Sequence, residues 1–403
     1  MRIHTVKEGD TVFKIARSYS TPPAKIIENN ALIAPDRLYP GQKLVILTPT
    51  RTYTVRGGDT LKSIALRFGV DTQELKRNNP SLMGGDRIYP GQILAVKYGE
   101  KEYGNAVVNG YYSRDCTKDR LSLYLPYLTY VTIASHKWEN GELCRLFNYD
   151  DALKLSKIEG ALPVMRVYTG SALCELQKEM ENFSKQIISR AKSDGFQGVS
   201  FSGGCVKEDG FGEFLREFRN ELKKSELELH LELDGNASVE PYKDLSETAD
   251  VVLLNFDRDE RSLDMDFASC EEALLNSYSS ICESRKTLLD VFSPSYLGDE
   301  AVDFQEIEKL IISRGIEAAY CEKSKTGSFR MKRYSGGQNK EISAHFPTPE
   351  NTKAKLELLG ELGFMGVSFD IKRSPISSLM AFNSLFHAEK ASSVAENSCR
   401  DRT

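Results

Sequence analysis

The chain has 403 residues, of which 40% are hydrophobic and 28% charged, and its formal net charge at pH 7 is −5. This length suits two or three domains with a sizeable buried core. The charge balance gives no electrostatic reason to expect nucleic acid or an anionic membrane surface as a partner, and no apolar run is long enough to cross a bilayer.

The N-terminal residues 1–10 lack the apolar core of a secretory signal peptide, so we expect cytoplasmic synthesis without classical secretion. The eight cysteines form no Cys-x-x-Cys pair, which predicts reduced thiols, most of them buried. The five histidines are dispersed along the chain without ligand spacing. We therefore expect neither a metal site nor a cofactor.

An internal repeat organises the first part of the chain. Residues 4–11 (His-Thr-Val-Lys-Glu-Gly-Asp-Thr) recur as residues 53–60 (Tyr-Thr-Val-Arg-Gly-Gly-Asp-Thr), and residues 38–42 recur as residues 88–92 around a shared Tyr-Pro-Gly-Gln. A repeat of this length is typical of duplicated modules. Each copy predicts a small βααβ module that consists of a strand, a Gly-Asp-Thr turn, two helices and a return strand.

The combined pattern is similar to the LysM family. That resemblance implies binding of polymers that contain N-acetylglucosamine, namely peptidoglycan or chitin, in a shallow groove between two loops of each module. The groove residues that it implies are Gly9, Asp10, Thr11, Leu32 and Ile33 in the first module and Gly58, Asp59, Thr60, Leu82 and Met83 in the second. A second interpretation stays open, in which Asp10 and Asp59 only cap helices. Each groove should bind weakly, and two linked grooves gain through effective concentration.

From residue 106 to residue 387, strand patterns alternate with helical patterns, which predicts a parallel sheet covered by helices. The strand candidates are residues 106–111, 127–134, 162–168, 198–202, 226–233, 251–256, 287–292 and 365–369. Eight such repeats predict an α/β fold of the TIM-type (β/α)8 barrel class. The expected domains are residues 1–48 and 52–98 for the two modules, 104–388 for the barrel and 389–403 for a mobile tail.

Several segments of the barrel region form a recognisable set. They are residues 110–113 (Gly-Tyr-Tyr-Ser), 127–130 (Tyr-Leu-Thr-Tyr), 194–199 (Asp-Gly-Phe-Gln-Gly-Val), 346–355 and 363–369. With them the region resembles glycoside hydrolase family 18, particularly the branch joined to LysM repeats in the spore cortex-lytic N-acetylglucosaminidases of spore-forming bacteria. The resemblance implies peptidoglycan as the ligand, spore-coat proteins as further partners, and the spore coat or cortex as the location.

In that family the fourth strand carries Asp-x-x-Asp-x-Asp-x-Glu. Aligned on Gly-Phe-x-Gly-Val, the acidic positions fall on Gln197, Ser200, Ser202 and Gly204, none of which is acidic. The resemblance assigns the last position to the general acid and the preceding one to a residue that orients the acetamido group of the substrate. General acid catalysis supplies roughly 10²–10⁴ in rate, and Gly204 has no proton to donate. Phe256 likewise stands where the family has a tyrosine hydroxyl.

Other polar residues lie near the expected mouth of the barrel. In the fifth strand candidate the leucines alternate with polar residues, so the leucines should face the helices and the polar set should face the lumen. By the same alternation Ser200, Ser202 and Gly204 face inward. The candidate pocket residues are Tyr112, Trp138, Glu232, Asp234, Asp257 and Asp370. Trp138 either stacks on a sugar or packs within its loop, and we favour packing.

Two hypotheses follow for the function. In the first, the chain is a non-catalytic protein that binds peptidoglycan, and its barrel serves as a glycan clamp or a docking scaffold. In the second, the chain is an N-acetylglucosaminidase that uses relocated acids such as Glu208, Glu232 or Asp257. The missing carboxylates of the fourth strand favour the first hypothesis.

Overall fold

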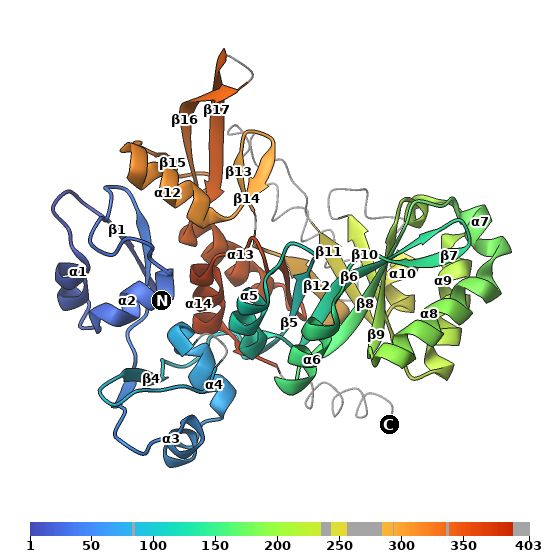
Figure 1. Cartoon of the computed structure of the whole chain (residues 1–403), viewed down its shortest axis with the longest axis horizontal. Helices are drawn as coiled ribbons and strands as arrows, with labels where there is room; N and C mark the ends of the chain where they lie inside the picture. The colour runs from blue at the N-terminus through green and yellow to red at the C-terminus, as the bar shows by residue number, and fades with distance from the viewer. Residues whose placement is uncertain (83–84, 235–242, 256–283, 293, 336–337, 390–403) are drawn as a thin grey trace.

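The structure is a computed structural model that describes residues 1–82, 85–234, 243–255, 284–292, 294–335 and 338–389 (Figure 1). Apart from Glu389, the tail expected to be mobile lies outside these residues. Within the described part of the chain, no helix combines the length and the apolar character that a membrane span requires. The five cysteines that lie there are all free, and two of them, Cys116 and Cys205, are buried. The other three cysteines lie outside the described residues, so the expectation of mostly buried thiols stays a prediction.

Two small βααβ modules form the N-terminal part, as the repeat predicts. The elements of the first module are β1 (Arg2–Thr5), α1 (Val12–Ser18), α2 (Pro23–Asn30) and β2 (Lys43–Ile46), and those of the second are β3 (Arg51–Thr54), α3 (Leu61–Phe68), α4 (Thr72–Arg77) and β4 (Ile93–Lys97). In each module the two strands pair antiparallel. The side chains of Thr11 and Thr60 cap α1 and α3 by accepting hydrogen bonds from the backbone N–H groups of Lys14 and Ser63.

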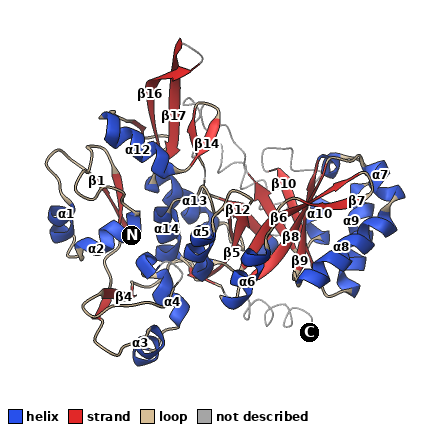
Figure 2. Ribbon diagram, viewed as in Figure 1, coloured by secondary structure: helices blue, strands red, loops and turns tan. Residues whose placement is uncertain are grey.

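The next part of the chain is a closed barrel of eight parallel strands, which confirms the expected fold (Figure 2). Its strands are β5 (Asn105–Tyr112), β6 (Tyr130–Glu139), β8 (Leu162–Thr169), β9 (Gly198–Gly203), β10 (Glu228–Asp234), β11 (Val251–Asn255), β12 (Thr287–Asp290) and β18 (Gly366–Asp370). β5 pairs with both β6 and β18, which closes the barrel. β6 starts later and runs further than expected, because residues 125–127 form a turn of 3₁₀ helix and the far end of β6 pairs with β7 (Glu142–Arg145).

Helices surround the barrel and cover its outward-facing apolar side chains (Figure 2). They are α5 (Lys118–Tyr124), α6 (Asp150–Ile158), α7 (Leu173–Lys178), α8 (Met180–Asp194), α9 (Phe211–Lys224), α10 (Lys243–Thr248), α13 (Pro349–Glu361) and α14 (Ile376–Leu385). Leu229, Leu231 and Leu233 of β10 are buried in the same cluster as Phe214 and Phe218 of α9. The leucines therefore face the helices and Glu232 faces the lumen, as strand alternation predicts. A last short strand, β19 (His387–Ala388), pairs with the start of β5.

A separate subdomain, which the sequence analysis did not predict, interrupts the barrel between β12 and β18. Its sheet has the order β14-β13-β17-β16-β15 and is antiparallel throughout. Its elements are β13 (Ser295–Leu297), β14 (Glu300–Val302), α12 (Phe304–Arg314), β15 (Ala319–Cys321), β16 (Thr326–Ser335) and β17 (Gln338–Pro347). The helix α12 packs through Ile307 and Ile311 against Phe329, Ala344 and Phe346 of the sheet. We call this segment the inserted subdomain.

Both modules dock onto the rest of the chain. In the second module the Arg77 side chain donates to the carbonyl of Pro126, and the Tyr127 hydroxyl donates to the carbonyl of Arg77. Lys76 forms a salt bridge with Glu159 of the barrel domain at 3.0 Å. The modules also contact each other, since the buried amino group of Lys25 in the first donates to Asn79 of the second at 2.6 Å.

Candidate functional site

The Gly-Asp-Thr loops of the two modules have the same internal bracing. The carboxylate of Asp10 accepts a hydrogen bond from the backbone N–H of Lys7 at 2.8 Å and lies 3.0 Å from Nε2 of His4. Asp59 accepts equivalent bonds from the N–H of Arg56 at 2.8 Å and from the Tyr53 hydroxyl at 2.7 Å. These bonds, led by the one from the backbone, lower the pKa of each carboxyl.

The helix-capping interpretation of Asp10 and Asp59 is therefore wrong. Thr11 and Thr60 are the caps, and each aspartate instead holds its loop in one conformation. Gly9 and Gly58 precede the aspartates with φ of 76° and 88°, a left-handed conformation that favours glycine. These hydrogen bonds and glycine conformations thus fix the loops without a ligand.

The loop that we expect to form the opposite wall of each groove is more deeply buried than the sequence suggests. Leu32 and Leu82 are only 9% and 6% exposed and belong to the cores of their modules, which leaves little of either side chain to meet a sugar. Ile33 is 36% exposed, and Met83 lies outside the described residues. Sequence reasoning missed Phe13, which is 76% exposed in the first turn of α1 and directly follows the loop. Its signal was an aromatic residue at a position that the helix periodicity leaves outside the core.

An ion pair lies in the lumen of the barrel. Arg166 of β8 donates to both carboxylate oxygens of Glu232 of β10, with N···O distances of 2.8, 3.0 and 2.7 Å. Ser200 of β9 donates to the same carboxylate at 2.8 Å. Burial lowers the pKa of Arg166, but the charge of Glu232 outweighs this and raises it above its usual value. Glu232 is only 6% exposed, so its oxygens are occupied within the lumen.

Three polar atoms beside this pair have no hydrogen-bond partner among the described residues. They are the Oγ of Ser202, the hydroxyl of Tyr111 and the Oδ1 of Asn255, although the Tyr111 hydroxyl lies close to Asn255. Buried polar atoms are normally satisfied by protein, water or a ligand. Among the described residues, these three atoms leave hydrogen-bonding capacity beside the Arg166–Glu232 pair.

The positions aligned with the missing acids lie at three different places. Gln197 precedes β9 and is exposed, whereas Ser200 and Ser202 are buried and on the lumen side. β9 ends at Gly203, so the strand alternation does not extend to Gly204, which begins a short 3₁₀ helix and is exposed. A Cβ added to Gly204 would meet nothing within 4 Å. The position that the alignment assigns to the general acid is thus exposed and has room for a side chain.

Several other candidate pocket residues lie away from the lumen. Tyr112 points outward and packs beside Phe147, because Tyr111 takes the inward position on β5. Trp138 is 1% exposed and packs edge-on against Phe183 of α8, so it cannot stack on a sugar. The tryptophan is therefore a packing residue, as we favoured.

The remaining carboxylates have structural partners or lie beyond the described chain. Asp234 is exposed and pairs with Lys207 at 3.1 Å. Asp370 accepts a hydrogen bond from the N–H of Lys372 at 2.8 Å, and both oxygens of Glu208 accept from the N–H of Leu173 at the start of α7. Phe256 and Asp257 lie outside the described residues.

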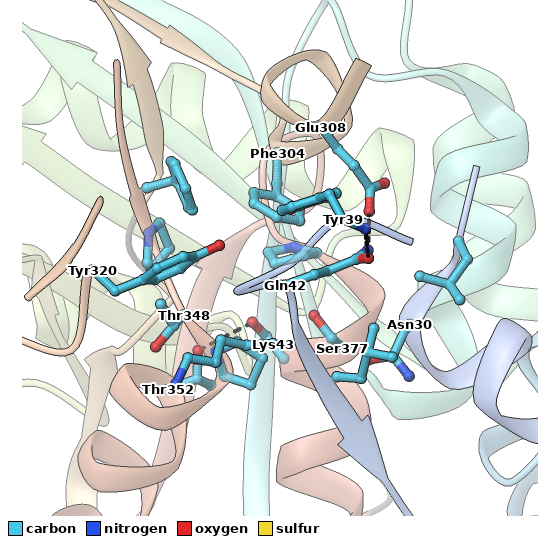
Figure 3. A pocket seen from close by; sticks show the side chains of 17 residues that line it. Asn30, Tyr39, Gln42, Lys43, Phe304, Glu308, Tyr320, Thr348, Thr352 and Ser377 are labelled. Carbon is cyan, nitrogen blue, oxygen red and sulfur yellow. Dashed lines mark hydrogen bonds between the residues drawn. The ribbon is translucent and has the colours of Figure 1, made fainter. Parts of the chain in front are cut away.

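A narrow cavity separates the first module from the inserted subdomain (Figure 3). Gln42 donates to the buried carboxyl of Glu308 on α12 at 2.8 Å, and Lys43 forms a salt bridge with Glu350 at 3.0 Å. Tyr39 is partly buried beside Tyr320. Burial raises the pKa of Glu308 to about 7, although the bond from Gln42 opposes this shift. The cavity encloses about 30 Å³, which leaves room for little more than one or two waters, so it is a docking interface and not a sugar site.

The LysM family model, described as the LysM domain, matches residues 4–47 and 53–97. The two N-terminal modules are LysM domains. Over this region the chain is similar to the endolysin of Bacillus phage B103, with 31% identity over 99 residues, 23% of this chain and 38% of that protein. It is also similar to the cell wall-binding protein YocH of Bacillus subtilis, with 37% identity over 97 residues and 33% of that protein covered.

The chain thus spans less than two fifths of the length of these curated relatives, and the likeness lies in the LysM domains. The whole fold is similar to the crystal structure of the spore cortex-lytic enzyme SleL of Bacillus megaterium QM B1551, with a TM-score of 0.73, 20% identity, and coverage of 96% of this chain and 98% of that one. The chitinase of Chromobacterium violaceum matches 69% of this chain and 98% of its own, with a TM-score of 0.60 and 14% identity. Two LysM domains followed by a chitinase-like barrel are therefore the architecture of this protein.

Proposed function

We propose that this protein binds a glycan that contains N-acetylglucosamine, the peptidoglycan of a cell wall or spore cortex, and that its barrel does not cut that glycan. The observation that carries the proposal is the ion pair in the lumen, where the buried Glu232 has both oxygens engaged by Arg166. The family resemblance adds that Gly204, which has no side chain, stands at the position of the general acid. The LysM domains supply the grip on the polymer.

The chemistry of glycoside cleavage explains why the lumen matters. The leaving oxygen must receive a proton from a group within hydrogen-bond reach. A carboxylate that accepts from a guanidinium on both oxygens is committed as an acceptor, and Glu208 is likewise committed to the N-terminus of α7. The alternative of relocated acids therefore finds no support in Glu208 or Glu232. Asp257 lies outside the described residues.

The LysM loops favour binding of an acetylated sugar in the first domain. The braced loop at Gly9 presents backbone groups that can meet an acetamido group. Phe13, two residues after the loop, and Ile33, in the loop that the family resemblance makes the opposite wall, offer exposed apolar surface. One shallow groove gives low affinity, but a second groove on the same polymer raises the effective concentration. The names of the relatives, an endolysin and a cell wall-binding protein, agree with a wall polymer as the ligand.

The first test measures catalysis directly. The full chain is incubated with peptidoglycan and with chitooligosaccharides, and the release of reducing ends is followed. We expect none. Turnover that disappears in a Glu232→Gln or an Asp257→Asn variant would show that the protein is an enzyme with relocated acids.

The second test measures binding through retention of the protein on insoluble peptidoglycan. We expect retention to weaken several-fold in a Phe13→Ala/Ile33→Ser variant, while Leu66→Ala, which changes another exposed apolar residue, serves as the matched control. Replacing Asp10 and Asp59 together should also weaken retention, because the loops lose their bracing. Unchanged retention in all of these variants would count against the LysM grooves.

For the location we propose the spore coat or cortex, with spore-coat proteins as further partners. The support is the shared architecture with a spore cortex-lytic enzyme. Fluorescent labelling of the protein in a sporulating host tests this, and a signal confined to the vegetative cytoplasm would contradict it.

A further inference from the structure

A two-stranded hairpin projects from the inserted subdomain, away from the barrel (Figure 1). β16 pairs with β17 from Thr326 opposite Pro347 to Ser335 opposite Gln338. The flanking strands cover only its base, because β15 pairs no further than Ser328 and β13 no further than Ala344. Among the described strands, none pairs with the outer half, and we call residues 330–335 and 338–341 the distal hairpin.

The distal hairpin gathers positive charge in a chain whose net charge is −5. Its exposed cations are Arg330, Lys332, Arg333 and Lys340, against the single acid Glu341. Many cations elsewhere in the described chain form ion pairs, but none of these four does. Four exposed cations against one acid in a ribbon this small require an explanation.

The pairing of two of these cations is unfavourable by itself. Arg333 lies directly opposite Lys340 across the strands, and residues so paired point to the same face. Like charges in this position destabilise a sheet, whereas Lys332 opposite Glu341 is a favourable pair. An anion that binds between Arg333 and Lys340 would remove the repulsion.

The other face of the hairpin is hollowed at its base. The hollow has a volume of about 600 Å³, within the range of ligand sites. It is lined by Glu317, Ala319, Ser328, Phe329, Arg330, Glu341, Ser343 and His345. Arg330 lies in this lining together with Glu317 and Glu341, and its planar guanidinium can hold a further carboxylate through two parallel hydrogen bonds. Further out, Tyr334 is 74% exposed.

We propose that the distal hairpin binds the carboxylates of the peptide stems that branch from the glycan strands of peptidoglycan, chiefly through Arg330, Arg333 and Lys340. This inference rests on the proposed function and adds a second feature of the same polymer to the sugar read by the LysM domains. It makes the protein discriminate peptidoglycan from chitin, which has the sugar without the peptide.

A structural explanation for the same charges has to be separated from this one. Exposed strand edges are often protected from aggregation by charged side chains. If that were the role of Arg333 and Lys340, their removal would lower solubility and leave the affinity for peptidoglycan unchanged.

The experiment compares the full-length wild type with an Arg330→Gln/Arg333→Gln/Lys340→Gln variant. The matched control is Lys154→Gln/Lys178→Gln/Lys192→Gln, which removes three exposed cations from the outer barrel helices. Retention is measured at low and high salt on native peptidoglycan, on peptidoglycan whose stem carboxylates have been amidated with carbodiimide and ammonium chloride, and on chitin.

We expect the hairpin variant to lose about tenfold in affinity for native peptidoglycan at low salt, as three exposed ion pairs of modest strength would give. Amidation and high salt should weaken the retention of the wild type and of the control variant equally, and they should leave the retention of the hairpin variant unchanged. Binding to chitin should be the same for all three proteins. Equal binding of the two variants to native peptidoglycan, or a wild type indifferent to amidation, would overturn the inference alone. A wild type retained on neither polymer would overturn the proposed function as well.

Discussion

Arg166 on β8 reaches across β9 and pairs with Glu232 on β10, and Ser200 of β9 donates to the same carboxylate from between them. The strand that carries the acids in glycoside hydrolase family 18 is therefore bridged by an ion pair from its two neighbours. Within the described lumen, Arg166 neutralises the charge of Glu232, and Asp290 at the end of β12 places a second carboxylate near Tyr111. This relationship gives the first prediction.

Glu232→Gln should destabilise the protein by about 2–3 kcal/mol, because it leaves the Arg166 charge in the lumen without its partner. Replacement of both residues, as Arg166→Met/Glu232→Leu, should recover most of that loss. Urea unfolding followed by far-ultraviolet circular dichroism measures both. A Glu232→Gln variant as stable as the wild type would mean that the pair is not formed in solution.

The two glycines at the end of β9 should respond in opposite ways to alanine. A Cβ at Gly203 would lie 2.6 Å from the carbonyl oxygen of Thr169, whereas a Cβ at Gly204 meets nothing within 4 Å. We expect Gly203→Ala to cost about 1–3 kcal/mol of unfolding free energy and Gly204→Ala to be nearly neutral. Thermal unfolding of the pair checks this. A larger loss of unfolding free energy for Gly204→Ala than for Gly203→Ala would contradict this geometry at the end of β9.

The contact between Gln42 and Glu308 should make stability depend on pH. The pKa of Glu308 rises from 4.5 to about 7 on folding, so the folded protein holds this proton more tightly. The stabilisation is complete below pH 4.5 and is lost as the pH rises through 7, with a total on the order of 3 kcal/mol.

Unfolding free energies between pH 4 and pH 8 measure this dependence. Glu308→Gln keeps an acceptor for Gln42 and has no proton to lose. The unfolding free energy of this variant should therefore not fall between pH 4.5 and pH 7 for this reason. Glu306→Gln, two residues away and exposed, is the matched control and should retain it. A wild-type profile that matches the Glu308→Gln profile would show that this carboxyl titrates normally.

Trp138, the single tryptophan of the chain, provides a probe of whether the barrel mouth engages sugar through an aromatic platform. Because it is buried against Phe183, its fluorescence should be blue-shifted and protected from acrylamide. Saturating chitooligosaccharide should leave the spectrum unchanged. A shift on addition of sugar, with no change in urea-unfolded protein, would place a ligand next to this side chain.

Much of the architecture could be predicted because its signals are local. The Gly-Asp-Thr repeats, the eight strand candidates and the alternation around Glu232 each depend on neighbouring residues in the chain, and the structure confirms the folds that they imply. The error at Tyr112 has the same origin. Side chains in a strand alternate between faces, so a shift of one residue exchanges Tyr111 for Tyr112 in the lumen.

Other features could not be predicted because they depend on contacts distant in sequence. Gln42 and Glu308 are 266 positions apart, and nothing near either residue indicates the other. The inserted subdomain was not predicted because the outer part of its hairpin buries little, so the alternation of apolar and polar residues ends after Met331. The bridging of β9 by Arg166 and Glu232 likewise requires knowing which strands are neighbours.

The docking of both LysM domains onto the barrel domain has a mechanical consequence. Tandem binding modules on flexible linkers can each search for a site independently, but here Lys76, Lys25 and Gln42 bond each domain to a neighbour. The protein meets its polymer as one rigid template, in which the spacing between attachment points is fixed by the fold. Because the spacing of its two LysM domains is fixed, the protein should bind a stiff polymer with regularly spaced sugars better than a flexible polymer of the same composition.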